Sequence, residues 1–156
     1  MIITLDTREP ADLRKWIIQK FPKIKFEEHA LKEGDILISC ENEKNTRVII
    51  ERKDIGDLYG SVMGSKGKSP RFPSQCVRLT THQTDSVVVL LITGSANDFI
   101  MKMKKSKGIV IDPSIFDSII ASVMTRYNIR VLVNPDKYKG IEQAINVGIK
   151  VCEGNL

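Results

Sequence analysis

The sequence GDILISC (residues 34–40) is followed, after the polar segment ENEKNTR (41–47), by VIIERKDIGDL (48–58). Two apolar runs rich in β-branched residues with a short polar connection predict a β-hairpin. Strand ends usually carry turn residues, whereas these strands end in Asp35 on one side and in Glu51, Arg52 and Lys53 on the other. Acids and a lysine gathered at one end of a hairpin suggest a functional site.

The register of this hairpin decides whether the charged residues meet. If the turn is centred near Glu43, Asp35 lies opposite Glu51 and both side chains point to the same side of the sheet. Lys53 shares that side, and Arg52 takes the other, because side chains alternate along a strand. A shift of one residue would separate the two acids.

Two neighbouring carboxylates repel each other unless a positive charge lies between them. A divalent cation provides that charge, and oxygen ligands suit Mg²⁺. Water bound to a metal ionises more easily, and Lys53 could orient that water or stabilise charge at a phosphorus centre. The alternative is a solvated strand end with cross-strand ion pairs, since Asp, Glu and Lys are common residues.

The rest of the chain alternates between strand and helix patterns. With 156 residues it can form one domain with a real core. Further strands are predicted at 1–6, 24–31, 86–92 and 129–133, and helices at 11–21, 54–62, 75–83, 114–127 and 141–151. A basic loop rich in Gly, Ser and Pro covers 65–74. This pattern predicts an α/β fold with a mixed sheet between helices.

Charge and cysteine usage limit the function classes. The net charge of +5 and the pI of about 9.1 favour a polyanionic partner. No apolar run is long enough to span a bilayer, and the N-terminus does not resemble a secretory signal. Cys40, Cys76 and Cys152 read as reduced, mostly buried thiols of an intracellular protein, in cytoplasm, nucleoid or nucleus. Isolated His29 and His82 argue against a zinc site.

Four blocks of the sequence together resemble a known family. The GD at 34–35 followed by ERKDIGD at 51–57 resembles the GD…ERKxxxD signature of the XPF/Hef-type structure-specific endonucleases, which include the Mus-type fork nucleases. LDTRE (5–9), PRFPSQCVRL (70–79) and DPSIFDSIIASVMTRYNIRVLV (112–133) resemble other blocks of this family, in the same order. Pro70 replaces the usual glycine, and Thr93-Gly94 stands where the family often has Glu-Gly.

The resemblance implies a restriction-endonuclease-like mixed sheet with an antiparallel hairpin and flanking helices. It implies an endonuclease that uses Mg²⁺, or Mn²⁺ in its place, to cut branched DNA such as a 3′ flap or a fork in DNA repair or recombination. We expect residues 1–156 to be a single nuclease domain, without the helix-hairpin-helix or helicase domains common in the family. A non-catalytic scaffold subunit, or a basic DNA-binding partner of an active nuclease, is the alternative.

The resemblance also assigns roles in catalysis. Asp35 and Glu51 would ligate the metal near the backbone carbonyl of Arg52, and Lys53 would assist the attacking water. Asp6 would be a further acidic ligand, or alternatively an Asp that caps a strand–helix turn. Asp57 would pair with Lys53 or Arg52, or be a first-turn acid favoured by the helix dipole.

DNA-binding candidates follow from the same blocks and from the basic loop. They are Arg8, Lys66, Lys68, Arg71, Gln75 and Arg78. Arg8 could also pair with Glu9 to order the site, and Arg71 and Gln75 could reach one phosphate together. The run KMKKSK (102–107) could hold a DNA arm, although such runs are usually solvated faces.

Family members pair through helices in the last third of the domain, so we expect a homodimer or a heterodimer with a related subunit. The candidate interface residues are Ile119, Val123, Tyr127 and Ile145. Ordinary core packing is the alternative for all of them.

Overall fold

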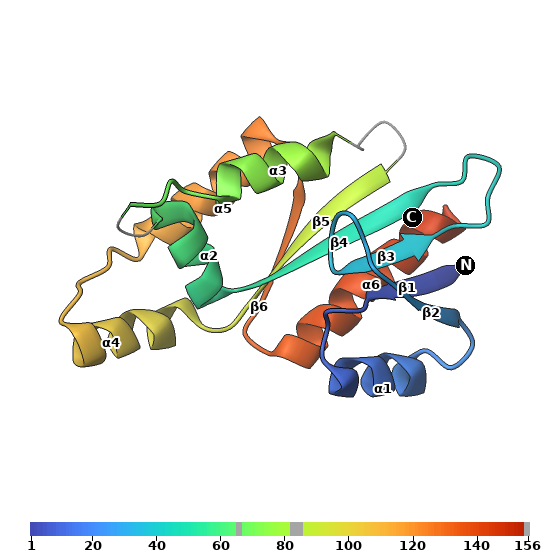
Figure 1. Cartoon of the computed structure of the whole chain (residues 1–156), viewed down its shortest axis with the longest axis horizontal. Helices are drawn as coiled ribbons and strands as arrows, with labels where there is room; N and C mark the ends of the chain where they lie inside the picture. The colour runs from blue at the N-terminus through green and yellow to red at the C-terminus, as the bar shows by residue number, and fades with distance from the viewer. Residues whose placement is uncertain (65–66, 82–85, 155–156) are drawn as a thin grey trace.

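A mixed β-sheet forms the centre of the molecule in the computed structural model, which describes residues 1–64, 67–81 and 86–154 (Figure 1). Within these residues the sheet has six strands in the order β2-β1-β3-β4-β5-β6. The strands are β1 (Ile2–Asp6), β2 (Lys25–His29), β3 (Ile36–Ser39), β4 (Arg47–Asp54), β5 (Ser86–Thr93) and β6 (Arg130–Asn134). β3 is antiparallel to both β1 and β4, and the other pairs are parallel. The predicted α/β class and the hairpin are confirmed.

The β3–β4 hairpin has the register that a turn centred near Glu43 predicts. Ile36 pairs with Ile50, and Ile38 with Val48. In the turn, the Thr46 N–H donates to Asn42 Oδ1 at 3.0 Å. Continuing this register by one residue places Asp35 opposite Glu51.

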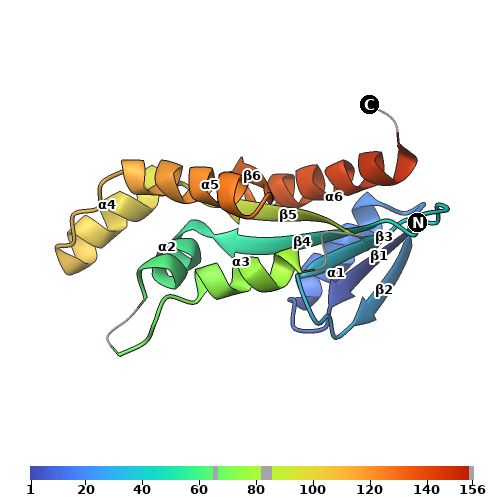
Figure 2. The ribbon, with the colours of Figure 1, turned by 90° about the horizontal axis from the view of Figure 1, so that it is seen from above.

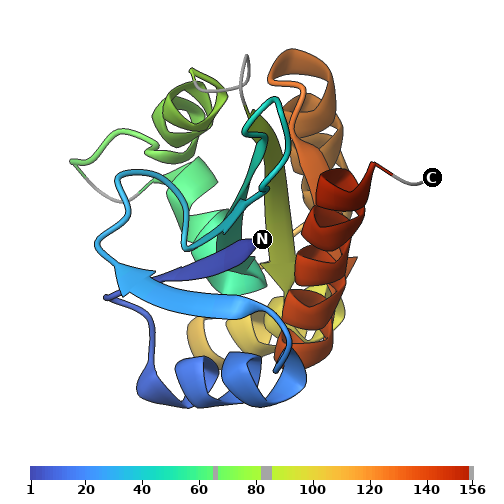
Figure 3. The same cartoon turned by 90° about the vertical axis from the view of Figure 1, so that its right-hand side faces the viewer.

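Helices cover both faces of the sheet. They are α1 (Ala11–Lys20), α2 (Ile55–Met63), α3 (Phe72–Thr80), α4 (Ala96–Lys107), α5 (Ser114–Arg126) and α6 (Lys137–Glu153). α2, α3 and α5 share one apolar core with alternate residues of β4 and β5, and α1 and α6 share a second core with the others. Figures 2 and 3 show α3 and α6 on opposite sides of these two central strands.

One helix, α4, was not expected from the pattern of apolar residues. Only four of its side chains, Ala96, Phe99, Ile100 and Met103, pack against the core, and none is fully buried. The residues that cap the two ends of α4 indicate a helix more clearly than the spacing of its apolar residues does. Ser95 caps the start by accepting from the Asp98 N–H at 3.2 Å, and Gly108 ends it in the left-handed conformation.

A disulfide joins Cys40, just after β3, to Cys152 in the last turn of α6. The expectation of three reduced thiols is therefore wrong, and only Cys76 is a free, buried thiol within the described residues. α6 packs so closely on β3 that a Cβ on Gly148 would lie 2.2 Å from Ile38 Cδ1. This packing brings the Cα atoms of the two cysteines to 5.0 Å. None of the described helices is long and apolar enough to cross a bilayer.

Candidate active site

Three acidic residues meet where β1, β3 and β4 lie side by side. The Asp6 N–H donates to the Asp35 carbonyl at 2.9 Å, and the Asp35 N–H donates to the Ile50 carbonyl at 2.9 Å. Side-chain alternation then directs Asp6, Asp35 and Glu51 to the same face of the sheet. This is the face that α2 and α3 cover.

Asp35 is held by the backbone of the neighbouring strand. The Arg52 N–H donates to Asp35 Oδ2 at 2.7 Å, which fixes the carboxylate against β4. Burial, together with the nearby Glu9 carboxylate, raises the pKa of Asp35 to about 6 against the effect of this hydrogen bond. The charged form of Asp35 is therefore less favourable than that of an exposed aspartate.

Glu51 is more deeply buried, with 7% of its surface exposed. Gln75 of α3 donates from Nε2 to Glu51 Oε1 at 2.5 Å. Burial and the charge of Asp35 raise the pKa of Glu51 to about 7, while Lys53 and Gln75 act in the opposite direction. The two carboxylates thus repel each other in a partly dehydrated position.

Asp6 is the acid of the three that already has a cationic partner. It is 1% exposed, and Arg8 Nε donates to its Oδ2 at 2.8 Å. The hydrogen bond from Arg8 holds the pKa of Asp6 below its ordinary value. Arg8 also interacts electrostatically with Asp35 and Glu51, so its guanidinium is positive charge close to all three acids.

Arg52 lies on the opposite face of β4 and pairs with Glu9, a contact in which both side chains are mostly buried. The expected pairing of Arg8 with Glu9 is therefore wrong, because Arg8 turns to Asp6 and Glu9 to Arg52. The expected pairing of Asp57 is not found either. Among the described residues, no ion pair joins this exposed acid of α2 to Lys53 or Arg52, since Arg52 faces away from α2.

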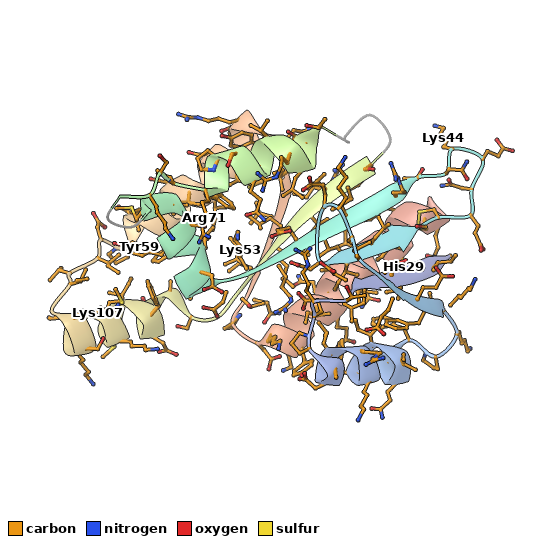
Figure 4. All side chains as sticks on the ribbon, in the orientation of Figure 1. His29, Lys44, Lys53, Tyr59, Arg71 and Lys107 are labelled. Carbon is orange, nitrogen blue, oxygen red and sulfur yellow. A yellow bond between two sulfur atoms is a disulfide. The ribbon has the colours of Figure 1, made fainter. Side chains whose placement is uncertain are left out.

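A polar groove of about 460 Å³ begins at Lys53, two residues along β4 from Glu51. Lys53, Lys68 and Arg71 supply its positive charge, and Gly56, Asp57, Gly60 and Ser61 of α2 line it together with Gly64, just past the end of that helix. Lys53 Nζ lies 5.8 Å from the centre of the Phe72 ring. Figure 4 shows Lys53 and Arg71 near one another beside the end of β4.

The DNA-binding candidates divide into separate groups. Lys68 and Arg71 line the groove, whereas Arg8 lies with the acids. Gln75 contacts Glu51 instead of joining Arg71 at a shared phosphate position. Arg78 is exposed, 3.9 Å from Glu33 Oε1. Lys66 lies outside the described residues.

The candidate interface residues lie mostly inside this one chain. Ile119, Val123 and Ile145 are 8%, 2% and 0% exposed, so they contribute to the core and offer little surface to a second subunit. Tyr127 is half-buried and packs against the same core as Ile119. On α5, Met124 is the large apolar side chain that faces outward.

The donor set at the strand ends fits a divalent cation in its chemistry. Asp35 and Glu51 offer oxygen ligands and a local excess of negative charge, which Mg²⁺ would neutralise. No group of three or more potential ligands is already arranged for a metal within residues 1–64, 67–81 and 86–154, and Asp6 is engaged by Arg8. The preformed part is the pair of Asp35 and Glu51.

Sequence reasoning overlooked two neighbours of this pair, Glu33 and Cys76, and assigned a third, Glu9, to Arg8 instead. Glu9 raises the pKa of Asp35, and Glu33 raises that of Glu51. The buried thiol of Cys76 interacts electrostatically with Lys53 and Glu51. Glu33 directly precedes Gly34-Asp35, so its position in the motif was an available signal. The contact of Cys76 arises only from the orientation of α3.

Comparisons with known proteins agree with this arrangement. A family model described as the ERCC4 domain matches residues 5–138. A solved structure of XPF from Aeropyrum pernix is similar with a TM-score of 0.68 and 20% identity, covering 97% of this chain and 64% of that one. A second structure of XPF from Aeropyrum pernix, in complex with DNA, gives a TM-score of 0.66 and 20% identity, covering 99% and 66%.

The chain therefore spans slightly less than two thirds of either solved protein, and the likeness at this identity concerns the fold. No curated protein sequence matches the chain.

Proposed function

Because the chain belongs to the ERCC4 domain family, we propose that it is a divalent-metal-dependent, structure-specific DNA endonuclease. The observation that supports this most is the pair of Asp35 and Glu51. Burial raises the pKa of both, and so do nearby acids: Glu9 acts on Asp35, and Asp35 acts on Glu51. A pair of acids held in this way is suited to binding a cation.

In this proposal Asp35 and Glu51 hold Mg²⁺, or Mn²⁺ in its place. The cation, when bound, would supply charge neutralisation at the phosphate and a more acidic water. The Arg52 N–H and the Gln75 amide fix the orientation of the two carboxylates. Lys53 places an ammonium group on the same face, where it can stabilise the developing negative charge.

The groove supports the choice of a nucleic acid as substrate. Lys68 and Arg71 can contact phosphates, and Gly60, beside which the space is open, allows a sugar–phosphate chain to approach α2 closely. We place the cut near a branch point, in 3′-flap or fork-like DNA during repair or recombination, on the family membership. The domain would work as a homodimer or with a related subunit.

A panel of labelled flap, fork, four-way junction, single-stranded and duplex DNA, with and without Mg²⁺, tests this proposal. We expect product only with the metal and mainly from branched substrates. Asp35→Asn and Glu51→Gln should each lower the rate by at least about 10²–10³-fold while DNA binding survives. Glu43→Gln, in the exposed hairpin turn, is the matched control and should cut like the parent chain.

A non-catalytic scaffold subunit is the second candidate. Two observations favour it: Asp6 is paired with Arg8, and the described part of the chain has no preformed group of three ligands. A folded protein that binds branched DNA but gives no product with Mg²⁺ or Mn²⁺ would support the scaffold and contradict the enzyme. A basic DNA-binding module without a metal site would also lack Mn²⁺ binding.

A further inference from the structure

The outer side of α4 carries an unpaired cluster of positive charge. Lys102, Lys104, Lys105 and Lys107 are all exposed or nearly so, and none forms an ion pair with another described residue. The acid of this helix, Asp98, lies in the first turn on the same side as Lys102 and Lys105, and within the described residues it forms no ion pair with either. Such a surface is complementary to a polyanion.

Helix stability alone does not account for this surface. Lysines in the last turn of a helix interact favourably with its dipole, which explains Lys104, Lys105 and Lys107. It does not explain Lys102, which lies four residues after Asp98 without forming an ion pair in the described part of the chain. Met101, beside Lys102 and Lys105, is 57% exposed. The unpaired charge of Lys102 therefore has no role in the packing of α4.

The position of α4 is fixed relative to the candidate active site. Phe99, on its inner side, lies 5.5 Å from the ring of Tyr59 and 6.3 Å from that of Phe116. Gly56 permits this packing, because a Cβ there would lie 3.2 Å from Phe99 Cε2. Tyr59 and Gly56 belong to α2, which follows directly on Lys53 and Asp54 of β4. A ligand on α4 is therefore held at a defined position relative to Lys53.

We propose that the exposed lysines of the second half of α4, from Lys102 to its end at Lys107, bind the sugar–phosphate backbone of one duplex arm of the DNA substrate. This inference rests on the proposed function and adds a second contact outside the active-site groove. Figures 1 and 4 show α4, with Lys107, at the end of the molecule beyond α2. An arm bound there would help to orient a branched substrate over the acids.

An anionic membrane is the other polyanionic surface that a lysine-rich helix could bind. Helices that lie on membranes insert their apolar face into the lipid. In α4 that face is turned inward, since Phe99, Ile100 and Met103 pack against the protein core. The structure therefore favours DNA.

The test replaces Lys102, Lys104, Lys105 and Lys107 by Gln in the full chain. The matched control replaces Lys15, Lys23, Lys44 and Lys139 by Gln, which removes the same charge from exposed lysines of other segments. Binding to a labelled fork is measured at several salt concentrations with Ca²⁺, so that binding is separated from cutting. Circular dichroism and thermal unfolding verify that both variants are folded.

We expect the α4 variant to bind the fork at least about tenfold more weakly, and its salt dependence to lose about two to four units of slope. The control variant should change affinity less than about threefold. Shortening the duplex arms of the fork should remove the difference between the parent chain and the α4 variant.

Equal affinity and equal salt slope for the parent chain and the α4 variant would overturn the inference. So would an equal loss in both variants, which would indicate a general charge effect. Binding to vesicles of equal parts phosphatidylcholine and phosphatidylserine is measured as well. If the α4 variant loses binding to these vesicles but binds the fork as the parent chain does, α4 is a membrane-binding surface and the inference is wrong. A chain that binds forks through α4 but never cuts them would contradict the proposed nuclease and leave this contact standing.

Discussion

The two faces of strand β4 differ in how their charged residues are paired. On one face Arg52 is paired with Glu9, and both are mostly buried. On the other face Glu51 lies near Asp35, an acid of the same sign, and burial raises the pKa of both. Adjacent residues of one strand therefore serve different purposes: the first face stabilises the fold, and the second keeps an unfavourable charge arrangement that a cation would relieve.

The face with Arg52 is also the more tightly closed one. Its core includes Ile38, Ile50 and Leu91, all fully buried, beneath α1 and α6. The disulfide between Cys40 and Cys152 fastens the end of α6 to the same region. The stability that this packing provides offsets the destabilisation by Asp35 and Glu51 on the other face. Functional sites are often destabilising in this way and depend on a stable remainder of the fold.

Removing Arg52 should cause the largest change in stability. Arg52→Met leaves Glu9 buried beside Asp35 without its counter-charge, so we expect the free energy of unfolding to fall by about 3–5 kcal/mol. Urea denaturation measures this. The double variant with Glu9→Gln should recover much of the loss. An equal loss in the single and double variants would show that the charge pair does not stabilise this face.

Removing the disulfide should have the next largest effect. Replacing Cys40 and Cys152 by Ser frees the end of α6, and we expect a loss of about 2–5 kcal/mol. Chemical denaturation with and without reductant measures it. The parent chain should become less stable in reductant, whereas the double variant should not respond. Equal stability of the parent chain with and without reductant would contradict the role of this bond.

Removing the charge of Glu51 should act in the opposite direction and be smaller. Its raised pKa means that the folded chain holds an extra proton between about pH 4.5 and pH 7, so stability falls as pH rises through this window. Because glutamine does not ionise, Glu51→Gln removes this fall in stability with rising pH. We expect about 1 kcal/mol of added stability at pH 8 and a smaller gain at pH 5.

Thermal unfolding of the parent chain and the Glu51→Gln variant at both pH values measures this difference. A variant less stable than the parent chain at pH 8 would show that the Glu51 charge is already neutralised in the folded state.

Arg78 provides the smallest expected effect. It is 58% exposed and lies 3.9 Å from Glu33, so Arg78→Ala should change the free energy of unfolding by less than about 0.5 kcal/mol. Urea denaturation of the Arg78→Ala and Arg52→Met variants compares the loss of an ion pair with an exposed arginine with the loss of a buried ion pair. A loss above about 2 kcal/mol in the free energy of unfolding of Arg78→Ala would mean that burial does not decide how much each of the two ion pairs stabilises the fold.

Much of the fold could be predicted because its signals are local. The polar turn at 41–47 sets the β3–β4 register, which places Asp35 opposite Glu51. The apolar run of β5 and the helix start at Asp112-Pro113 are equally local. The choice of Arg8 for Asp6, and of Arg52 for Glu9, depends on side-chain directions that spacing does not reveal.

Other features depend on contacts between distant segments. The Cys40–Cys152 disulfide spans 112 residues and requires the final path of α6, so no local pattern predicted it. Helix α4 was missed because its apolar side is narrow, although Ser95 and Gly108 mark its ends.

The central claim is that Asp35 and Glu51 bind one divalent cation together, and calorimetric titration of Mn²⁺ into the chain at pH 8 tests it most directly. We predict one site in the parent chain and in Glu43→Gln, and its loss in both Asp35→Asn and Glu51→Gln. A parent chain that binds no Mn²⁺, or a site that persists in both acid variants, would contradict the claim.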